Sequence, residues 1–151
     1  MDIRPLERRD LEQWRSLWDG YNAFYGRSGP TALPEAVTRT TWSRFFDPGE
    51  PVHAMVAERE GHLIGLVHYL LHRSTTLIGP TCYLQDLFTA PEARGRGTGR
   101  ALIEAVYAAA AAGGAERVYW QPQEGNTTAR RLYDAIAEYS GFVVYCKTLS
   151  P

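Results

Sequence analysis

The sequence lacks any apolar run long enough to cross a membrane, and its beginning is too charged for a secretory signal. No stretch of the 151 residues approaches the roughly 20 apolar residues that a transmembrane helix needs. The first residues, MDIRPLERRDLEQW, carry charges where a signal peptide has its apolar segment. We therefore expect a cytoplasmic protein without a membrane partner.

The sequence also lacks an excess of charge of one sign and is poor in cysteine. Its 16 Lys and Arg residues nearly balance 17 Asp and Glu residues, for a net charge of −1. Nucleic-acid-binding domains usually show a basic excess, so we expect no nucleic-acid partner. The two cysteines, Cys82 and Cys146, lie far apart and outside any CxxC pattern. We expect both to be reduced, buried side chains.

What is present is an ordinary globular mixture of 44% apolar and 22% charged residues. The length suits one domain with a substantial core, and the sequence contains no internal repeat. We therefore predict a single domain over residues 1–151.

Hydrophobic periodicity changes along the chain from helical to strand-like and back. Leu11, Trp14, Trp18 and Tyr21 recur every three or four residues, as on one face of a helix. Two apolar runs around the turn REG favour a β-hairpin. The whole pattern predicts helices near 11–25, 34–46, 98–112 and 126–141, and strands at 3–6, 53–58, 62–72, 81–89, 117–121 and 142–149.

A glycine-rich loop, PEARGRGTGR (91–100), lies between the predicted strand 81–89 and the predicted helix 98–112. Free backbone N–H groups at the start of a helix bind anions, and glycine lets a ligand come close to them. Arginine side chains add positive charge. We therefore predict a phosphate-bearing ligand here, bound by Arg94, Gly95, Arg96, Gly97, Thr98, Gly99 and Arg100.

Three common phosphate-binding patterns do not fit this loop. The Walker pattern needs Lys followed by Ser or Thr, which the loop lacks. The dinucleotide pattern GxGxxG needs glycine where Arg100 stands, and an acidic residue where the next strand ends in Gln121. A methyltransferase loop usually has an acidic residue at the position of Ala93.

The loop instead resembles a known signature. Arg94-x-x-Gly97-x-Gly99, preceded by a strand and Pro91, is similar to the acetyl-CoA signature of the GCN5-related N-acetyltransferases, the GNAT family. Downstream, Asn126-x-x-Ala129-x-x-Leu132-Tyr133 resembles the family's second CoA-contacting helix. YLQDLFTAPEARGRGTGRALI and VYWQPQEGNTTARRLY resemble the branch that acetylates polyamines and histone-type lysines.

The resemblance implies a fold and a reaction. The fold would be mixed α/β, with a mostly antiparallel central sheet of six to seven strands, four helices and the order β-α-α-β-β-β-α-β-α-β. The reaction would move an acetyl group from acetyl-CoA to a primary amine by direct attack in a ternary complex. A non-catalytic acyl-CoA sensor with the same fold, or a small nucleotide-binding domain, stays an open alternative.

The resemblance also implies roles for individual residues. Tyr133 would donate a proton to the leaving thiolate, since a phenol with a pKa of about 10 is protonated at pH 7; its helical spacing also fits a core tyrosine. Backbone N–H groups near Leu87 and Phe88 would contact the thioester oxygen. The predicted CoA contacts outside the glycine loop are Leu87, Phe88, Thr89, Asn126, Ala129 and Tyr133.

At the expected position of the proton acceptor, this chain departs from the family pattern. Relatives in the polyamine branch carry Glu-Asp where this chain has Gln85-Asp86, and an amide cannot accept a proton. Adjacent strand residues point to opposite faces unless a bulge intervenes. Asp86 could be the base or a structural carboxylate, and a water chain ending at a backbone carbonyl, Glu58 or His68 stays open.

Aromatic side chains could line the acceptor pocket, because aromatic rings bind alkylammonium groups by cation–π contact. The candidates are Tyr21, Tyr25, Tyr83 and Trp120. His68 and His72 have no third ligand at metal-binding spacing, so we predict no metal.

The last predicted strand, FVVYCKTL (142–149), is apolar on both faces and has no later strand to cover its edge. Exposed apolar edges are aggregation hazards that proteins normally conceal. We therefore predict a homodimer built on this strand.

Overall fold

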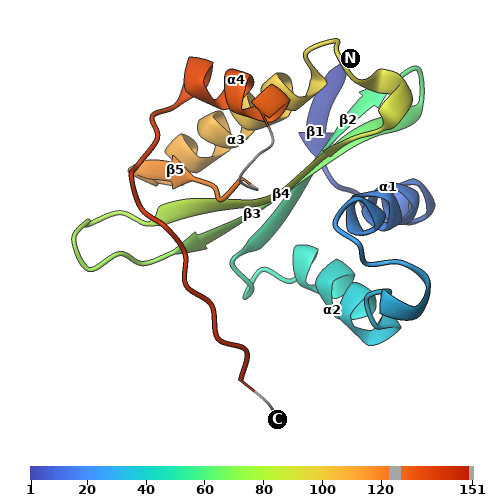
Figure 1. Ribbon diagram of the computed structural model, residues 1–151, viewed down its shortest axis with the longest axis horizontal. Coiled ribbons are helices and arrows are strands. Elements are labelled where there is room, and N and C mark those ends of the chain that lie inside the picture. The colour runs from blue at the N-terminus through green and yellow to red at the C-terminus, as the bar shows by residue number, and fades with distance from the viewer. Residues whose placement is uncertain (123–126, 150–151) are drawn as a thin grey trace. The chain divides into compact units, whose positions relative to one another are not determined.

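The computed structural model describes residues 1–122 and 127–149 of the chain (Figure 1). Asn126, a predicted CoA contact, lies outside these ranges. The contacts between residues divide the chain into two compact units, Met1–Gln121 and Pro122–Pro151. The single domain expected from the length stays a prediction.

The first unit is built on one five-stranded sheet in the order β1-β2-β3-β4-β5 (Figure 1). The first four strands pair antiparallel to their neighbours, and β5 pairs parallel to β4. The strands are β1 (Asp2–Pro5), β2 (Val52–Arg59), β3 (His62–His72), β4 (Thr81–Thr89) and β5 (Arg117–Tyr119). The hairpin between β2 and β3 turns at Glu60 and Gly61, both with positive φ, so the predicted hairpin is confirmed.

The helices cover both faces of the sheet. In β3, His68 contacts Trp14 on α1, whereas a Cβ on Gly65 would meet Leu102 and Thr98 on α3. Positions an odd number apart on a strand face opposite sides, so α1 and α3 pack on opposite faces. The helical segments of this unit are η1 (Arg8–Asp10), α1 (Leu11–Phe24), η2 (Gly29–Thr31), α2 (Glu35–Phe45), η3 (Pro91–Ala93) and α3 (Thr98–Ala112).

Aromatic side chains of α1 form the core on its face of the sheet. Trp14 is fully buried, and its ring stacks on Trp18 with 5.9 Å between centroids. Trp18 in turn stacks on Tyr21 at 5.3 Å. Gly20 faces β4, where an added Cβ would lie 3.0 Å from the ring of Phe88. The missing side chain at Gly20 therefore lets α1 approach the sheet closely.

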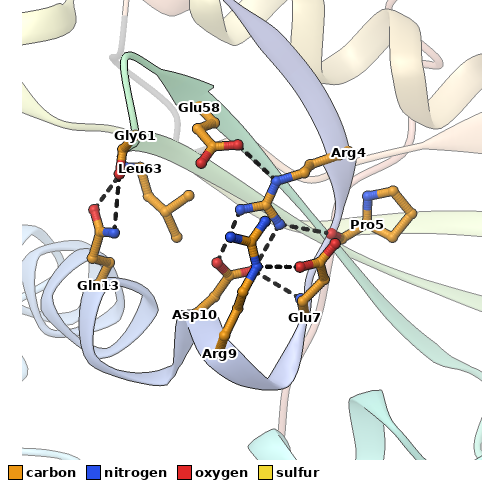
Figure 2. A network of polar contacts seen from close by, with 9 residues as sticks. All are labelled: Arg4, Pro5, Glu7, Arg9, Asp10, Gln13, Glu58, Gly61 and Leu63. Atoms are coloured by element: carbon orange, nitrogen blue, oxygen red, sulfur yellow. Dashed lines mark hydrogen bonds and ion pairs between the residues drawn. The ribbon is translucent and has the colours of Figure 1, made fainter.

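A polar network joins β1, η1 and β2 (Figure 2). Arg4 donates hydrogen bonds from Nη1 and Nη2 to the two carboxylate oxygens of Asp10, at 2.8 and 2.9 Å. Its Nε donates to Glu58 at 2.9 Å. The Asp10 carboxylate also accepts the backbone N–H of Glu7. The pKa of Asp10 is lowered, mainly by hydrogen bonding to Arg4.

The second unit contains α4 (Thr127–Ile136), followed by residues 137–149 without regular structure. The predicted strand at 142–149 is therefore wrong for this structure, and the described sheet has five strands rather than six or seven. Phe142 is 84% exposed and Tyr145 is 95% exposed. A strand needs a neighbour for its backbone hydrogen bonds, and high β propensity alone does not supply one.

Smaller expectations also need correction, and the helix expected near 126–141 ends at Ile136. Cys146 lies in this irregular segment and is exposed, whereas Cys82 is buried in β4 as expected. Strand β5 ends at Tyr119, two residues earlier than predicted, so Trp120 follows the strand. None of the helices in the described ranges is long and apolar enough to span a membrane.

Candidate functional site

The site begins with a bulge in β4. Asp86 pairs with His68 of β3, but the next β3 residue, Tyr69, pairs with Leu84, so Gln85 is the extra residue. Without the bulge, Leu84 and Asp86 would share one face of the sheet. With it, Asp86 shares the face of His68, which α1 covers, and Gln85 is exposed. The bulge thus turns the Asp86 carboxylate toward the face of the sheet that Trp14, Trp18 and Tyr21 of α1 cover, called the aromatic face below.

Asp86, His68 and Trp14 form a chain of buried hydrogen bonds. Nδ1 of His68 lies 2.9 Å from Oδ2 of Asp86, and Nε1 of Trp14 lies 3.1 Å from Nε2 of His68. An indole N–H can only donate, so Nε2 of His68 must be unprotonated. The imidazole proton is then on Nδ1 and is donated to Asp86. His68 is therefore a neutral ring whose two nitrogens are both in use.

The surroundings of this chain are apolar and tightly packed. His68 is 2% exposed, and its ring centroid lies 4.7 Å from that of Phe45 and 5.1 Å from that of Trp18. Asp86 is more accessible, with 11% of its side chain exposed. The Asp86 carboxylate is therefore partly accessible to solvent, whereas the His68 ring is not.

Tyr21 lies beside Asp86 on the same face. Burial raises the pKa of the Tyr21 phenol, and the charge and hydrogen bonding of Asp86 raise it further. Tyr21 thus remains a protonated hydroxyl next to a carboxylate. Its ring lies 5.0 Å from that of Tyr25, so two predicted acceptor-pocket residues lie together.

Two other side chains considered as proton acceptors, Glu58 and His68, already have hydrogen-bond partners. Glu58 is ion-paired with Arg4 in the network of Figure 2. Accepting a proton at Nε2 would cost His68 its hydrogen bond from Trp14. Among these candidates, Asp86 is the carboxylate that the sheet turns toward the aromatic face.

The glycine-rich loop has the geometry expected of an anion site. Gly95 and Gly97 adopt φ values of +76° and +82°, in the left-handed region, and a Cβ on either would meet open space. Gly97 is the N-cap of α3, and no side chain in the described ranges caps that helix end. The first N–H groups of a helix have no acceptor within it. Among the described residues, the loop therefore offers uncapped amides with open space beside its glycines.

The arginines of the loop differ in how they are placed. Nε of Arg94 donates to the Thr89 carbonyl at 3.2 Å, and its guanidinium lies against the rings of Phe88 and Phe24. Nε of Arg100 pairs with Glu104 at 2.9 Å, one turn along α3. Arg96 is exposed on the loop itself. A cavity of about 510 Å³ between α1 and η3 is lined in part by Gly20, Phe24, Phe88 and Arg94.

Two further predicted acceptor residues lie near the end of the sheet. The ring of Tyr83 stacks on Tyr119 of β5 at 4.9 Å, and its hydroxyl donates to Gln121. Burial raises the pKa of Tyr83, and the negative charge of Asp86 adds to this. Trp120 lies beside Tyr107 of α3, with 6.3 Å between centroids. A role in acceptor binding stays a prediction for both.

Ala129 and Tyr133 belong to α4 in the second unit, and the predicted CoA contact Asn126 lies outside the described residues. Their roles stay predictions. Sequence reasoning did not find Trp14 as the partner of His68. The one available signal was a histidine in the otherwise apolar centre of HLIGLVHYLLH.

Comparison with known proteins supplies the family. Residues 14–137 match the sequence profile of the Acetyltransferase (GNAT) family. The chain belongs to the GNAT family. The D-amino-acid N-acetyltransferase HPA3 of Saccharomyces cerevisiae is 34% identical over 145 residues, which cover 95% of this chain and 88% of HPA3. The uncharacterized N-acetyltransferase YhfO of Bacillus subtilis is 30% identical over 148 residues, which cover 97% of this chain and 96% of YhfO.

Solved structures confirm the GNAT fold. The aminoglycoside acetyltransferase AAC(6')-Iy, in complex with a bisubstrate analogue of CoA and acetylneamine, superposes with a TM-score of 0.82 at 20% identity, covering 99% of this chain and 98% of that one. A probable acetyltransferase superposes with a TM-score of 0.84 at 22% identity, and the match covers 100% of this chain and 99% of that one. This GNAT protein is an N-acetyltransferase with a mixed α/β fold.

Proposed function

We propose that this GNAT protein transfers the acetyl group of acetyl-CoA directly to a primary amine, with Asp86 as the proton acceptor. The observation that supports this most is the bulge at Gln85, which turns the Asp86 carboxylate onto the face of Tyr21 and Tyr25. A carboxylate that a buried, neutral histidine orients is a suitable general base. The glycine loop supports the acetyl-CoA half of the proposal.

The loop fits the pyrophosphate of acetyl-CoA. An anion at the N-terminus of α3 would meet N–H groups that no side chain of the described residues caps, together with the positive end of the helix dipole. The open space at Gly95 and Gly97 lets phosphate oxygens approach the backbone. Arg96 and Arg100 add positive charge at the same end. In our proposal these loop residues bind the diphosphate, and Asn126 and Ala129 are further contacts to CoA.

Removing a proton from the amine is a large part of the reaction. An alkylamine with a pKa of about 10.4 is neutral for only about 0.04% of the time at pH 7. A base in the site therefore accelerates the reaction by up to about three orders of magnitude. We assign this role to Asp86, and assign to Tyr133 the donation of a proton to the departing thiolate. Backbone N–H groups near Leu87 and Phe88 would stabilise the charge on the thioester oxygen.

We propose direct attack rather than acetyl transfer through the buried cysteine of β4. Cys82 is buried in β4, and burial raises the pKa of its thiol to about 11. A thiol of that pKa is protonated at pH 7 and is a poor nucleophile. A ternary complex in which acetyl-CoA supplies the acetyl group to a bound amine needs no such residue.

Two measurements test the proposed function together. Calorimetric titration with acetyl-CoA reports binding, and a thiol-release assay over polyamines, lysine peptides, aminoglycosides and amino acids reports transfer. We expect binding and amine-dependent release of CoA. Binding without release on any amine would instead support an acyl-CoA sensor, and affinity for ATP or NAD in place of acetyl-CoA would support a nucleotide-binding domain.

The acceptor class is not decided by family membership. The resemblance to the polyamine and histone branch predicts cationic amines, whereas the yeast relative is named for D-amino acids. Both classes therefore belong in the panel.

We also propose a homodimer formed through residues 142–149. This segment is apolar and β-forming, and Val143, Val144 and Leu149 are 71%, 62% and 82% exposed. Pairing with the same segment of a second copy would bury these side chains and satisfy the backbone. Light scattering of the full chain at micromolar concentration tests this, and a clean monomer would contradict it.

A further inference from the structure

A second charged group, Arg27, lies at the aromatic face of the site, where α1 ends. Gly26 adopts a φ of +80° and turns the chain. The backbone N–H of Arg27 then donates to the carbonyl of Asn22 at 2.8 Å. The backbone of Arg27 is thereby anchored to the last turn of α1.

The side chain of Arg27 is anchored as well. Its Nε donates to Oδ1 of Asn22 at 2.7 Å, and the buried Asn22 side chain donates in turn to the carbonyl of Trp18 at 2.9 Å. The guanidinium carbon lies 5.7 Å from the ring centroid of Tyr21 and 5.6 Å from that of Tyr25. Arg27 is half-buried. Within residues 1–122 and 127–149, its two terminal nitrogens have no hydrogen-bond or ion-pair partner.

Tyr21 connects this guanidinium to the carboxylate of Asp86. Its ring contacts Arg27 and stacks on Trp18, whose ring centroid lies 5.1 Å from that of His68, the hydrogen-bond partner of Asp86. In agreement with this placement, Asp86 raises the pKa of the Tyr21 phenol and Arg27 lowers it. The same aromatic side chain therefore has a fixed negative charge and a fixed positive charge near it. Each charge is oriented by a buried neighbour, His68 for Asp86 and Asn22 for Arg27.

We propose that the acceptor is an amino acid, with its amino group directed to Asp86 and its carboxylate paired with Arg27. This inference rests on the proposed acetyl transfer. A planar guanidinium whose two terminal nitrogens have no partner among the described residues matches a carboxylate, which accepts two parallel hydrogen bonds. A polyamine would instead bring a second cation toward Arg27, and like charges repel. The pair of opposite charges thus selects an acceptor that carries both signs.

The test compares acceptors that differ only in the carboxylate. D- and L-alanine, methionine and phenylalanine are each paired with the matching amino alcohol, and kcat/KM is measured by thiol release. We expect the wild-type protein to prefer the amino acid over its alcohol by roughly 10- to 100-fold in at least one pair, the range for a hydrogen-bonded charge pair. Equal or greater activity on every alcohol would overturn the proposal.

Variants assign the preference to Arg27. Arg27→Met should remove most of the preference for acid over alcohol, and Arg27→Lys should retain part of it. Arg39→Met, a change at an exposed arginine of α2, should leave the preference and the activity as in wild type. If Arg27→Met lowers kcat/KM equally on acids and alcohols, Arg27 has only a structural role and the proposal is wrong.

A binding measurement separates this proposal from the proposed function. The amino acids are titrated calorimetrically into protein saturated with CoA, in which no transfer can occur. We expect binding that weakens about 10-fold or more in Arg27→Met. If no amine releases CoA but this Arg27-dependent binding persists, acetyl transfer fails and the carboxylate site stands. If transfer occurs without Arg27-dependent binding, the carboxylate site fails.

Discussion

Replacing Asp86 with asparagine removes the proposed base while keeping its shape. The Oδ1 of an asparagine can still accept the proton on Nδ1 of His68, so the hydrogen bond of 2.9 Å and the contact with Trp14 behind it are retained. We therefore expect Asp86→Asn to fold and to bind acetyl-CoA as the wild-type protein does. The change tests proton acceptance rather than packing.

The size of the effect follows from the ionisation of the amine. Without a base, the reaction depends on the roughly 0.04% of an alkylamine that is neutral at pH 7. We expect kcat/KM at pH 7 to fall about 10²- to 10³-fold, which corresponds to about 2.7–4.1 kcal/mol at 1.36 kcal/mol per tenfold. The loss should shrink as the pH rises toward the pKa of the amine, because more acceptor then arrives neutral.

The assay is thiol release at saturating acetyl-CoA from pH 6.5 to 10. Asp19→Asn is a matched control, because Asp19 is an exposed carboxylate of α1 that pairs with Arg15. We expect its pH profile to match that of the wild type. A loss for Asp86→Asn that is the same at every pH, or no loss at all, would refute the assignment of Asp86 as the base.

Three other predictions concern the loop, the acid and the N-terminal network. Gly97→Val should abolish acetyl-CoA binding in calorimetry and lower stability by about 1–3 kcal/mol, since valine is strained at a φ of +82°; unchanged affinity would refute the phosphate site. Tyr133→Phe should lower kcat by about 10²-fold with little change in acetyl-CoA affinity; unchanged turnover would make Tyr133 a core residue. Asp10→Ala should cost about 2–4 kcal/mol of unfolding free energy at pH 7 in urea titrations, because it leaves the part-buried Arg4 with fewer partners. Arg4 lowers the pKa of Asp10 in the folded state. The stabilisation by this ion pair is therefore complete above about pH 4 and is lost as the pH falls through the folded-state pKa. The difference in unfolding free energy between Asp10→Ala and the wild type should accordingly be smaller at pH 3 than at pH 7.

The predicted elements of the first unit follow from local patterns. The bounds of β4 and α3 match the expected ranges 81–89 and 98–112, because a turn or a glycine marks each end. The residue type at Gly95 and Gly97 suits the positive φ that both adopt, since few other residues tolerate it. These features depend on neighbours in the sequence.

Features that depend on distant residues could not be predicted. The bulge at Gln85 is an inter-strand register shift, which the alternation within one strand does not reveal. The bond from Trp14 to His68 joins residues 54 positions apart. The predicted strand 142–149 failed for the same reason, because its propensity carries no information about a pairing partner.

Two-substrate initial-rate kinetics with product identification test the central claim most directly. Acetyl-CoA and the best acceptor of the panel are varied together, and mass spectrometry measures the acetylated amine against the CoA released. Direct transfer predicts one acetylated amine for each CoA and intersecting double-reciprocal lines. Parallel lines would indicate an acetylated protein intermediate, and CoA release without acetylated amine would contradict transfer to an amine.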